Sequence, residues 1–247
     1  MPNVAVIIPA RQGSQAIKDK NIKKLKNFPL IAYSIAAAKL AGITNIYIST
    51  DSKKYKNICE KFGAKVPFLR PKNISNKLST DYEFVIHFLK WLQSNELVLP
   101  DYLIHLRPTT PLRDPKIIIK ALKMIKKHKN STSLRSAHKA KETFEKWFYK
   151  NKNNYFVGIK KKTSPDKINS PRQKYKDVFI PNGYIDILKP NFILKNKKLH
   201  GNKMLIYETP SCIEVDDIFD FEILKNFLLN KSNLLHKYLI RYKNEKI

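Results

Sequence analysis

Short apolar runs alternate along the chain with longer segments in which apolar residues recur at helical spacing. Residues 4–8 form an uninterrupted apolar run that ends at Pro9, which is typical of a strand buried on both faces of a parallel sheet. Residues 46–49, 102–106 and 131–136 predict further strands. This alternation predicts an α/β domain with a doubly wound, mostly parallel sheet, whose ligand crevice lies beyond the carboxyl ends of the strands.

Start and stop signals predict helices between these strands. Pro29 begins one apolar segment and Gly42 follows its end, and Thr80 with Glu83 has the form of a capping box. The predicted helices cover residues 29–41, a segment from Asp51 or Ser52 to about 62, a segment from Thr80, residues 114–128 and a closing helix from Asp217. Later strands are expected at residues 185–188 and 213–215.

The alternation stops between residues 137 and 181. This polar stretch is rich in lysine and asparagine and carries aromatic residues such as Trp147 and Tyr155. A long insertion of this kind is usually functional. We therefore expect one domain over residues 1–247 with an inserted arm at residues 137–181.

No segment has the features of a secretion signal or a membrane span. The first apolar run is short and ends at Pro9. Cys59 and Cys212 have neither a pairing motif nor metal-ligand spacing, so neither a disulfide framework nor a zinc site is expected. We expect a cytoplasmic protein that does not bind membranes.

The chain is strongly basic. It has 48 Lys and Arg residues against 20 Asp and Glu residues, a formal net charge of +28. A basic nucleic-acid-binding protein is therefore one alternative. The lysines are spread over nearly every segment, however, without a zinc-finger or RNA-binding signature. We expect no specific nucleic-acid partner and attribute to the charge a field that attracts an anionic substrate.

A polar, basic loop follows the first strand and contains Arg11, Gly13, Ser14, Lys20 and Asn21. A loop in this position can direct backbone N–H groups and cationic side chains at phosphates, and a glycine permits close approach. The loop is neither a Walker loop nor a Gly-x-Gly-x-x-Gly motif. It is interpreted as a phosphate-binding loop, with a solvated basic loop as the alternative.

A second candidate segment, residues 106–113, follows the predicted strand at 102–106. Two prolines fix its backbone, so Arg107 or Arg113 could be held for bidentate binding of a carboxylate or phosphate. The alternative is a rigid turn with hydroxyl caps.

A carboxylate cluster near the C-terminal end stands out in a chain so poor in acids. In a strand, residues two apart share a face, so Glu214 and Asp216 would project together while Val215 packs. Two oxygen ligands beside a triphosphate suit Mg²⁺ or Mn²⁺. Asp217 is alternatively only the cap of the closing helix.

Seven segments resemble, in content and order, the acylneuraminate cytidylyltransferases, a family of CMP-sialic acid synthetases that includes CMP-legionaminic and CMP-pseudaminic acid synthetases. The segments are residues 8–21, 49–52, 62–64, 106–113, 171–173, 182–184 and 214–216, so the resemblance covers nearly the whole chain. It implies a nucleotidyltransferase that joins CMP from CTP to the anomeric hydroxyl of a nonulosonic, sialic-type acid and releases pyrophosphate.

The resemblance also implies roles for individual residues and a homodimer whose arm reaches the partner. The implied nucleotide-binding residues are Arg11, Gly13, Ser14, Lys20, Asn21, Arg70 and Ser79. The implied residues on the side of the 2-keto-3-deoxy sugar acid are Arg107, Lys146, Arg172, Gln173 and Asn182. Glu214 and Asp216 match the metal carboxylates, and the reaction centre would consist of Arg11, Lys20 and Asp216.

Three positions depart from the family pattern. Gln15 stands where the family usually has a lysine, Lys77 where it usually has an acid, and Glu214 where aspartate is commoner; Lys18 is one substitute for the missing lysine. These departures keep a catalytically impaired nucleotide-binding homologue as an alternative. A Kdo cytidylyltransferase is another, although Lys20-Asn21 and Arg172-Gln173 look more like the acylneuraminate branch. The sequence does not identify the sugar.

Overall fold

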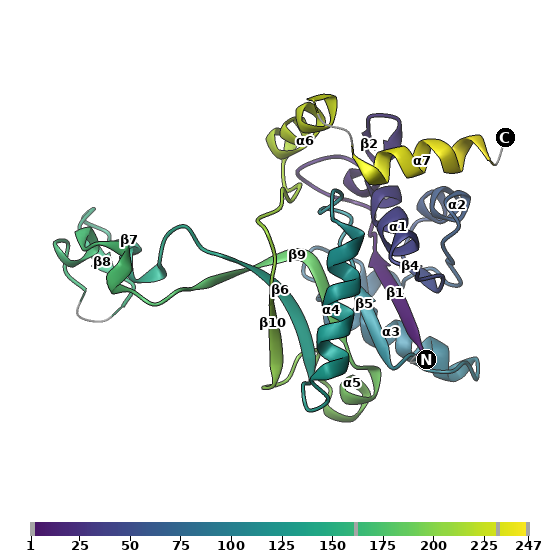
Figure 1. Ribbon diagram of the computed structural model, residues 1–247, viewed down its shortest axis with the longest axis horizontal. Helices are drawn as coiled ribbons and strands as arrows, with labels where there is room; N and C mark the ends of the chain where they lie inside the picture. The colour runs from purple at the N-terminus through teal and green to yellow at the C-terminus, as the bar shows by residue number, and fades with distance from the viewer. Residues whose placement is uncertain (1–2, 161–162, 231–232, 246–247) are drawn as a thin grey trace.

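The computed structural model describes residues 3–160, 163–230 and 233–245 (Figure 1). In this part of the chain six strands form one sheet, in the order β10-β6-β9-β5-β1-β4. Its strands are β1 (Val4–Pro9), β4 (Ile46–Ser49), β5 (Tyr102–His105), β6 (Ser133–Lys139), β9 (Phe179–Leu188) and β10 (Met204–Glu208).

The sheet is mostly parallel. β1 pairs in parallel with both β4 and β5, and β10 pairs in parallel with β6. β9 lies between β5 and β6 and is antiparallel to both. The doubly wound α/β fold predicted from the alternating pattern is confirmed, with one antiparallel strand inside it.

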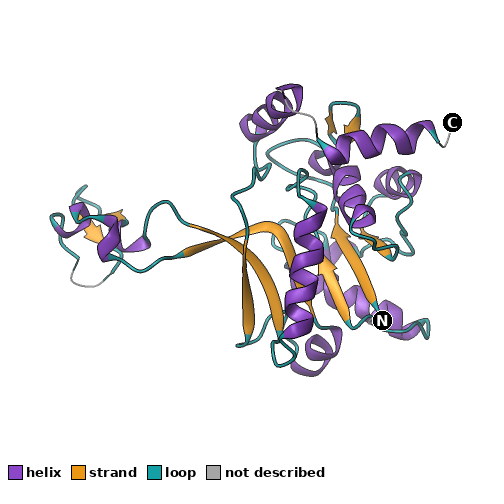
Figure 2. Cartoon of the chain, in the orientation of Figure 1, coloured by secondary structure: helices purple, strands orange, loops and turns teal. Residues whose placement is uncertain are grey.

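Helices cover both faces of the sheet (Figure 2). They are α1 (Leu30–Leu40), α2 (Lys53–Lys61), α3 (Asp81–Ser94), α4 (Pro115–Lys127), α5 (Pro190–Asn196), α6 (Ile218–Asn230) and α7 (Leu234–Asn244). One core cluster joins the sheet to α1, α2, α4, α6 and α7, and a second joins it to α3 and α5. Residues 30–38 of α1 are all buried, because α4 and α7 contact the helix as well as the sheet.

The start signals work as the sequence predicts. Ser52 Oγ accepts a hydrogen bond from the backbone of α2, Asp114 Oδ1 does the same for α4, and Thr80 with Glu83 forms the capping box of α3. These bonds satisfy N–H groups that have no partner inside the helix.

One expectation about the later elements is wrong, and several elements were not predicted. Residues 213–215 form no strand, since Val215 N bonds only to the carbonyl of Thr109, in a loop whose flanking Pro108 and Pro111 cannot donate to a ladder. The edge strand is instead β10, a segment that the sequence analysis did not assign. The helices α5 and α7 were also not expected.

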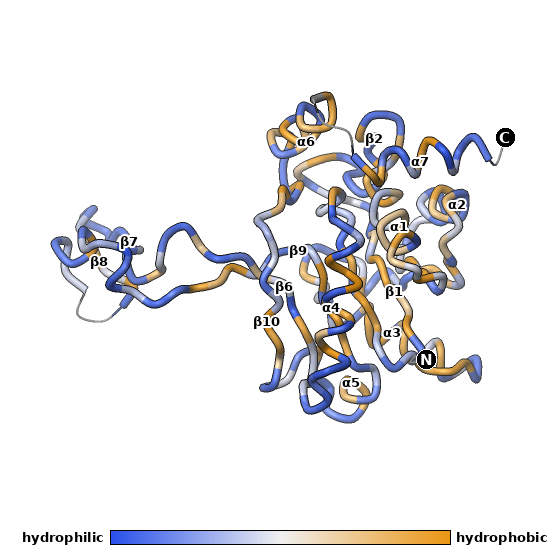
Figure 3. The backbone as a smooth tube through the Cα atoms, in the orientation of Figure 1, coloured by the Kyte–Doolittle hydropathy of each residue, from blue (hydrophilic) through white to orange (hydrophobic). Residues whose placement is uncertain are grey.

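The irregular stretch leaves the sheet as an arm (Figure 1). β6 continues to Lys139 and β9 begins at Phe179, and the chain between them carries the small hairpin of β7 (Phe148–Lys150) and β8 (Phe156–Gly158). Figure 3 shows that hydrophilic residues predominate along the arm, whereas β1 and α1 are hydrophobic. No helix among the described residues is long and apolar enough to cross a membrane.

Candidate active site

A cleft of about 250 Å³ opens where β1 and β5 end. These two strands are neighbours, but the chain leaves β1 toward β4 on one side and later returns to β5 on the other. The carboxyl ends of such a pair form the topological switch point at which α/β sheets bind ligands. The cleft is lined by Pro9, Arg11, Ser14, Lys20, Asn21, Arg70, Ser79, Asp81, Phe84, Arg107, Pro108 and Thr109.

Most residues that the sequence assigns to the nucleotide lie in this cleft. Arg11, Ser14, Lys20 and Asn21 come from the loop after β1, and Arg70, Ser79 and Arg107 come from later loops. Gly13 lies in the same loop and has φ +80°, a conformation that favours glycine. A larger cleft of about 500 Å³ near the end of α4 contains none of the predicted site residues.

The phosphate-binding loop is attached to the body of the protein at several points. Gln12 N donates to Asp51 Oδ1 at 2.8 Å, and Asn21 Nδ2 donates to the carbonyl of Arg11 at 3.1 Å. Asn21 therefore ties the end of the loop to its beginning. Lys18, the substitute considered for the missing lysine, is exposed and does not line the cleft.

Asp19 lies just before Lys20 and Asn21 in the left-handed region, with φ +55°. Lys54 Nζ donates to Asp19 Oδ2 at 2.8 Å and Tyr55 Oη to Oδ1 at 2.9 Å. These bonds, the one from Lys54 first, lower the pKa of Asp19. Burial raises the pKa of Tyr55, and the hydrogen bond to Asp19 raises it further, so the phenol stays protonated and remains a donor. Helix α2 thereby fixes the backbone that directs Lys20 and Asn21 into the cleft.

The carboxylate cluster lies at the rim of the cleft. Glu214 Oε1 is 3.2 Å from the hydroxyl of Thr109, and Asp216 Oδ1 is 3.6 Å from Lys20 Nζ. Lys20 also donates to the carbonyl of Val215 at 2.8 Å, which attaches this segment to the phosphate-binding loop. The Asp216 side chain is 79% exposed. No group of three or more His, Cys, Asp or Glu residues that could hold a metal occurs in the described chain.

Asp217 has a different role from its neighbour. Its Oδ1 accepts from Asp220 N at 3.0 Å, and Asp220 Oδ2 accepts from the backbone N of Asp216 and of Asp217. This reciprocal pair caps α6 and leaves the carboxylate of Asp216 outside the cap.

Arg70 forms a buried wall of the cleft. Its Nε donates to Ser49 Oγ at 3.0 Å and its Nη2 to the Ser49 carbonyl at 2.5 Å, and the guanidinium lies 5.1 Å from the ring centre of Phe84. Burial lowers the pKa of Arg70 to about 10, so the group stays charged at neutral pH. Arg70 is thus a fixed cation.

The two arginines of the proline-rich segment separate into different roles. Arg107 lines the cleft, whereas Arg113 is buried and donates to Ser34 Oγ at 2.7 Å and to the carbonyls of Arg107, Gly183 and Tyr184. Burial lowers the pKa of Arg113 to about 10, which still leaves it charged. Of the two candidates for anion binding, only Arg107 is available to a ligand in the cleft.

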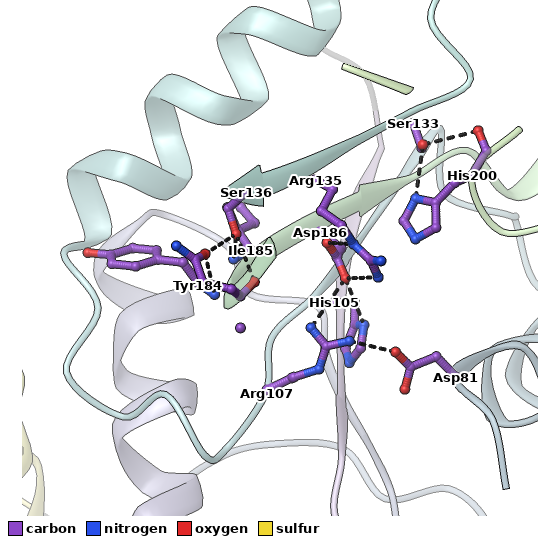
Figure 4. Close-up of polar contacts among 12 residues, drawn as sticks. Asp81, His105, Arg107, Ser133, Arg135, Ser136, Tyr184, Ile185, Asp186 and His200 are labelled. Carbon is purple, nitrogen blue, oxygen red and sulfur yellow. Dashed lines mark hydrogen bonds and ion pairs between the residues drawn. The ribbon is translucent and has the colours of Figure 1, made fainter. Parts of the chain in front are cut away.

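Arg107 belongs to a polar network on the sheet (Figure 4). Its Nη2 donates to Asp81 Oδ2 at 2.6 Å, and its Nη1 lies 3.5 Å from Asp186 Oδ2. Asp186 also accepts from Arg135 Nε at 2.9 Å and from Nη2 at 3.1 Å, and His105 Nδ1 lies 3.6 Å away. Burial alone would raise the pKa of Asp186, but the neighbouring His105 and Arg135 hold it well below its usual range.

The remaining predicted sugar-side residues do not line this cleft. Asn182 is buried, where its Nδ2 donates to Thr209 and its Oδ1 accepts from Ser136, so it joins β9 to β6 and the turn after β10. Three further residues, Lys146, Arg172 and Gln173, lie on the arm, away from the chain's own cleft.

A family model described as cytidylyltransferase matches residues 5–176. The chain belongs to the cytidylyltransferase family. It is 31% identical over 247 residues to post-translational flagellin modification protein B of Campylobacter coli, with 96% of this chain and 99% of that protein covered. It is 30% identical to pseudaminic acid cytidylyltransferase of Campylobacter jejuni, with 89% of this chain and 93% of that protein covered. The predicted membership of the cytidylyltransferase family is confirmed.

A longer relative and a solved structure also match the chain. The cytidylyltransferase is 29% identical to N-acylneuraminate cytidylyltransferase of Escherichia coli over 89% of its own length, but it spans only about half, 51%, of that relative. A solved structure of CMP:2-keto-3-deoxy-manno-octonic acid synthetase complexed with CTP matches with a TM-score of 0.67 at 16% identity, covering 93% of this chain and 100% of the other. At that identity the match shows the shared fold.

Four polar residues of the cleft and its network were not predicted from the sequence: Asp81, His105, Arg135 and Asp186. A signal was present for Asp186, since a carboxylate inside the apolar run of residues 185–188 needs buried partners. Nothing in the sequence indicated which residues those partners would be, because they come from β5, β6 and the loop after β5.

Proposed function

We propose that this cytidylyltransferase joins CMP from CTP to the anomeric hydroxyl of a nonulosonic, sialic-type acid. The observation that carries the proposal is the gathering of Arg11, Lys20, Arg70 and Arg107 in one cleft at the switch point of the sheet. The names of the relatives, which include pseudaminic acid and N-acylneuraminate cytidylyltransferases, support this class of acceptor.

In the proposed reaction the hydroxyl oxygen attacks the α-phosphorus of CTP, a new P–O bond forms, the bond to pyrophosphate breaks, and the hydroxyl proton passes to solvent. Such a transfer requires positioning and stabilisation of spreading phosphate charge rather than a protein nucleophile. Lys20 and Arg11 stabilise that charge from the loop after β1, while Arg70 adds a buried, fixed cation. Arg107 binds the carboxylate of the sugar acid.

Glu214 and Asp216 are the residues that would hold Mg²⁺ or Mn²⁺ beside the phosphates. Hard oxygen donors suit these ions, and Mg²⁺ usually takes few protein carboxylates together with substrate phosphates. The exposed carboxylate of Asp216 next to Lys20, a cleft residue, fits such a shared site. The metal would neutralise phosphate charge and favour departure of pyrophosphate.

Two neighbouring carboxylates provide the experiment for the metal. Asp216→Ala should abolish pyrophosphate release from CTP while leaving thermal melting unchanged. Asp217→Ala, the matched control, should cost about 1 kcal/mol of stability, because it removes a helix cap, and little activity. Near-normal turnover of Asp216→Ala, or an inactive Asp217→Ala, would reject the assignment.

CTP should also be preferred over ATP, GTP and UTP.

A cytoplasmic homodimer joined through the arm is also proposed. The hairpin of the arm exposes Trp147, Phe148, Tyr149 and Tyr155, and the substrate-side residues Lys146 and Arg172 lie outside the chain's own cleft. A partner's cleft is therefore their proposed destination. Light scattering that gives a fully active monomer at micromolar concentration would contradict this.

A further inference from the structure

Arg107 is held between two carboxylates that differ in exposure and in their other partners (Figure 4). Its Nη1 faces Asp186 at 3.5 Å, and its Nη2 bonds to Asp81 at 2.6 Å. Each terminal nitrogen of the guanidinium thus already faces a carboxylate before any substrate binds. A sugar carboxylate that pairs with Arg107 in a bidentate way competes with one of these partners.

Asp186 is a permanent partner. Its side chain is 1% exposed, and its two oxygens are shared among Arg135, His105 and Arg107. Removal of Asp186 would take away the carboxylate that Arg107 and Arg135 share, and removal of Arg107 would take one cation from a carboxylate that must stay compensated because it is buried. Asp186 therefore fixes one end of the guanidinium from inside the sheet.

Asp81 is an exchangeable partner. Its side chain is 34% exposed and it lines the cleft, where it is the only acid among the described lining residues. It is also the first residue of α3, where the helix dipole stabilises a carboxylate even without a cation beside it. Loss of its bond to Arg107 is therefore inexpensive, as for other solvent-accessible ion pairs.

We propose that Asp81 occupies on Arg107 the place of the sugar acid's carboxylate, and that binding of the acid exchanges one carboxylate for the other while Asp186 keeps the guanidinium in position. The inference rests on the proposed function, which brings a carboxylate and a triphosphate into this cleft. Asp81 then competes with the sugar acid for Arg107 and lowers the affinity for it. Its removal should strengthen binding, in contrast to removal of a residue that contacts the sugar or accepts its proton.

The test is pyrophosphate release at saturating CTP, with N-acetylneuraminic, pseudaminic and legionaminic acids as acceptors. For the acid that wild type uses fastest, Asp81→Asn should lower KM about two- to five-fold, the range expected for a partly exposed ion pair, with kcat unchanged. Glu60→Gln on α2 removes the same charge far from the cleft and should leave KM unchanged. A higher KM or a lower kcat for Asp81→Asn would overturn the exchange.

The methyl ester of the same acid separates exchange from general charge repulsion. The ester carries no carboxylate, so its inhibition constant should be equal for wild type and Asp81→Asn; equal tightening of acid and ester would overturn the proposal. If wild type uses no acid of the panel, the proposed function fails on its own. The exchange is then tested by titrating N-acetylneuraminate into protein with ¹⁵N-labelled arginine. The Arg107 signal, assigned with Arg107→Lys, should shift more strongly in Asp81→Asn, and no shift in either protein would reject it.

Discussion

Tyr55 donates a hydrogen bond of 2.9 Å to Asp19, and thereby joins the core of helix α2 to the loop that carries the proposed phosphate-binding residues. The phenol ring is fully buried, whereas Lys54, the other partner of Asp19, is 59% exposed. Of the two partners of Asp19, the buried one is therefore the one that fixes its position.

Tyr55→Phe should weaken the use of CTP without unfolding the protein. The ring still fills the core, but Asp19 loses a fixed donor, so Lys20 and Asn21 shift; we expect kcat/KM for CTP to fall about tenfold, since small misplacements cost such factors. Steady-state kinetics with either substrate varied measures this. Lys54→Ala, which removes only a surface ion pair, is the control and should have a small effect. A larger loss for Lys54→Ala than for Tyr55→Phe would refute this account of the loop.

Arg113→Met should chiefly affect stability. The variant leaves the carbonyls of Arg107, Gly183 and Tyr184 buried without their donor, which should cost about 3 kcal/mol or more in urea unfolding. Activity per folded molecule should fall less than in Arg107→Ala, because Arg113 does not line the cleft. If Arg113→Met keeps its stability and loses all activity, Arg113 is a ligand-binding residue after all.

The elements that could be predicted from the sequence were those whose signals act between residues close together in the chain. The capping box at Thr80 and the apolar run before Pro9 act through neighbours in the sequence, and both elements formed as expected. The strand expected around Val215 failed because a strand needs a partner with free backbone groups, and the only contact available was Thr109 in a proline-flanked loop. Which strand or loop a segment pairs with depends on the tertiary structure and cannot be read from the segment itself.

The same distinction applies to the site. The loop residues Arg11 to Asn21 were recognisable because they follow one strand directly. Asp186 and Arg135 were not, since their meeting requires β9 to enter the sheet between β5 and β6. The resemblance to a family identified single residues, and the network that holds Arg107 became visible only in the assembled sheet.

The lowered pKa of Asp186 gives stability a defined pH dependence. A carboxyl whose pKa is lower in the folded than in the unfolded state stabilises the fold fully above the unfolded pKa of about 3.9, and this contribution is lost as pH falls through the folded value. Urea midpoints of wild type should therefore decline more steeply below about pH 4 than those of Asp186→Asn. Parallel curves for the two proteins would show that the buried network does not hold Asp186 ionised.

Gly183→Ala should disturb the metal carboxylate. A Cβ at this position would lie 2.7 Å from Glu214 Oε1 and 2.5 Å from Thr110 Oγ1, so Glu214 must move. We expect a higher Mg²⁺ concentration for the half-maximal rate of pyrophosphate release. Gly42→Ala is the control: no atom lies within 4 Å of its Cβ, and its φ of +79° costs about 1 kcal/mol of stability without a change in the response to Mg²⁺. If the rate of Gly183→Ala depends on Mg²⁺ as that of wild type does, Glu214 does not bind the metal.

Transfer of CMP to a sugar acid can be observed by following all phosphorus atoms in one reaction. Wild-type enzyme, CTP, Mg²⁺ and the panel of nonulosonic acids are monitored by ³¹P NMR. We expect equal amounts of pyrophosphate and of a new phosphodiester signal from a CMP-sugar, and no CMP-sugar when the acid is omitted. Release of inorganic phosphate from CTP, or no consumption of CTP with any acid of the panel, would contradict it.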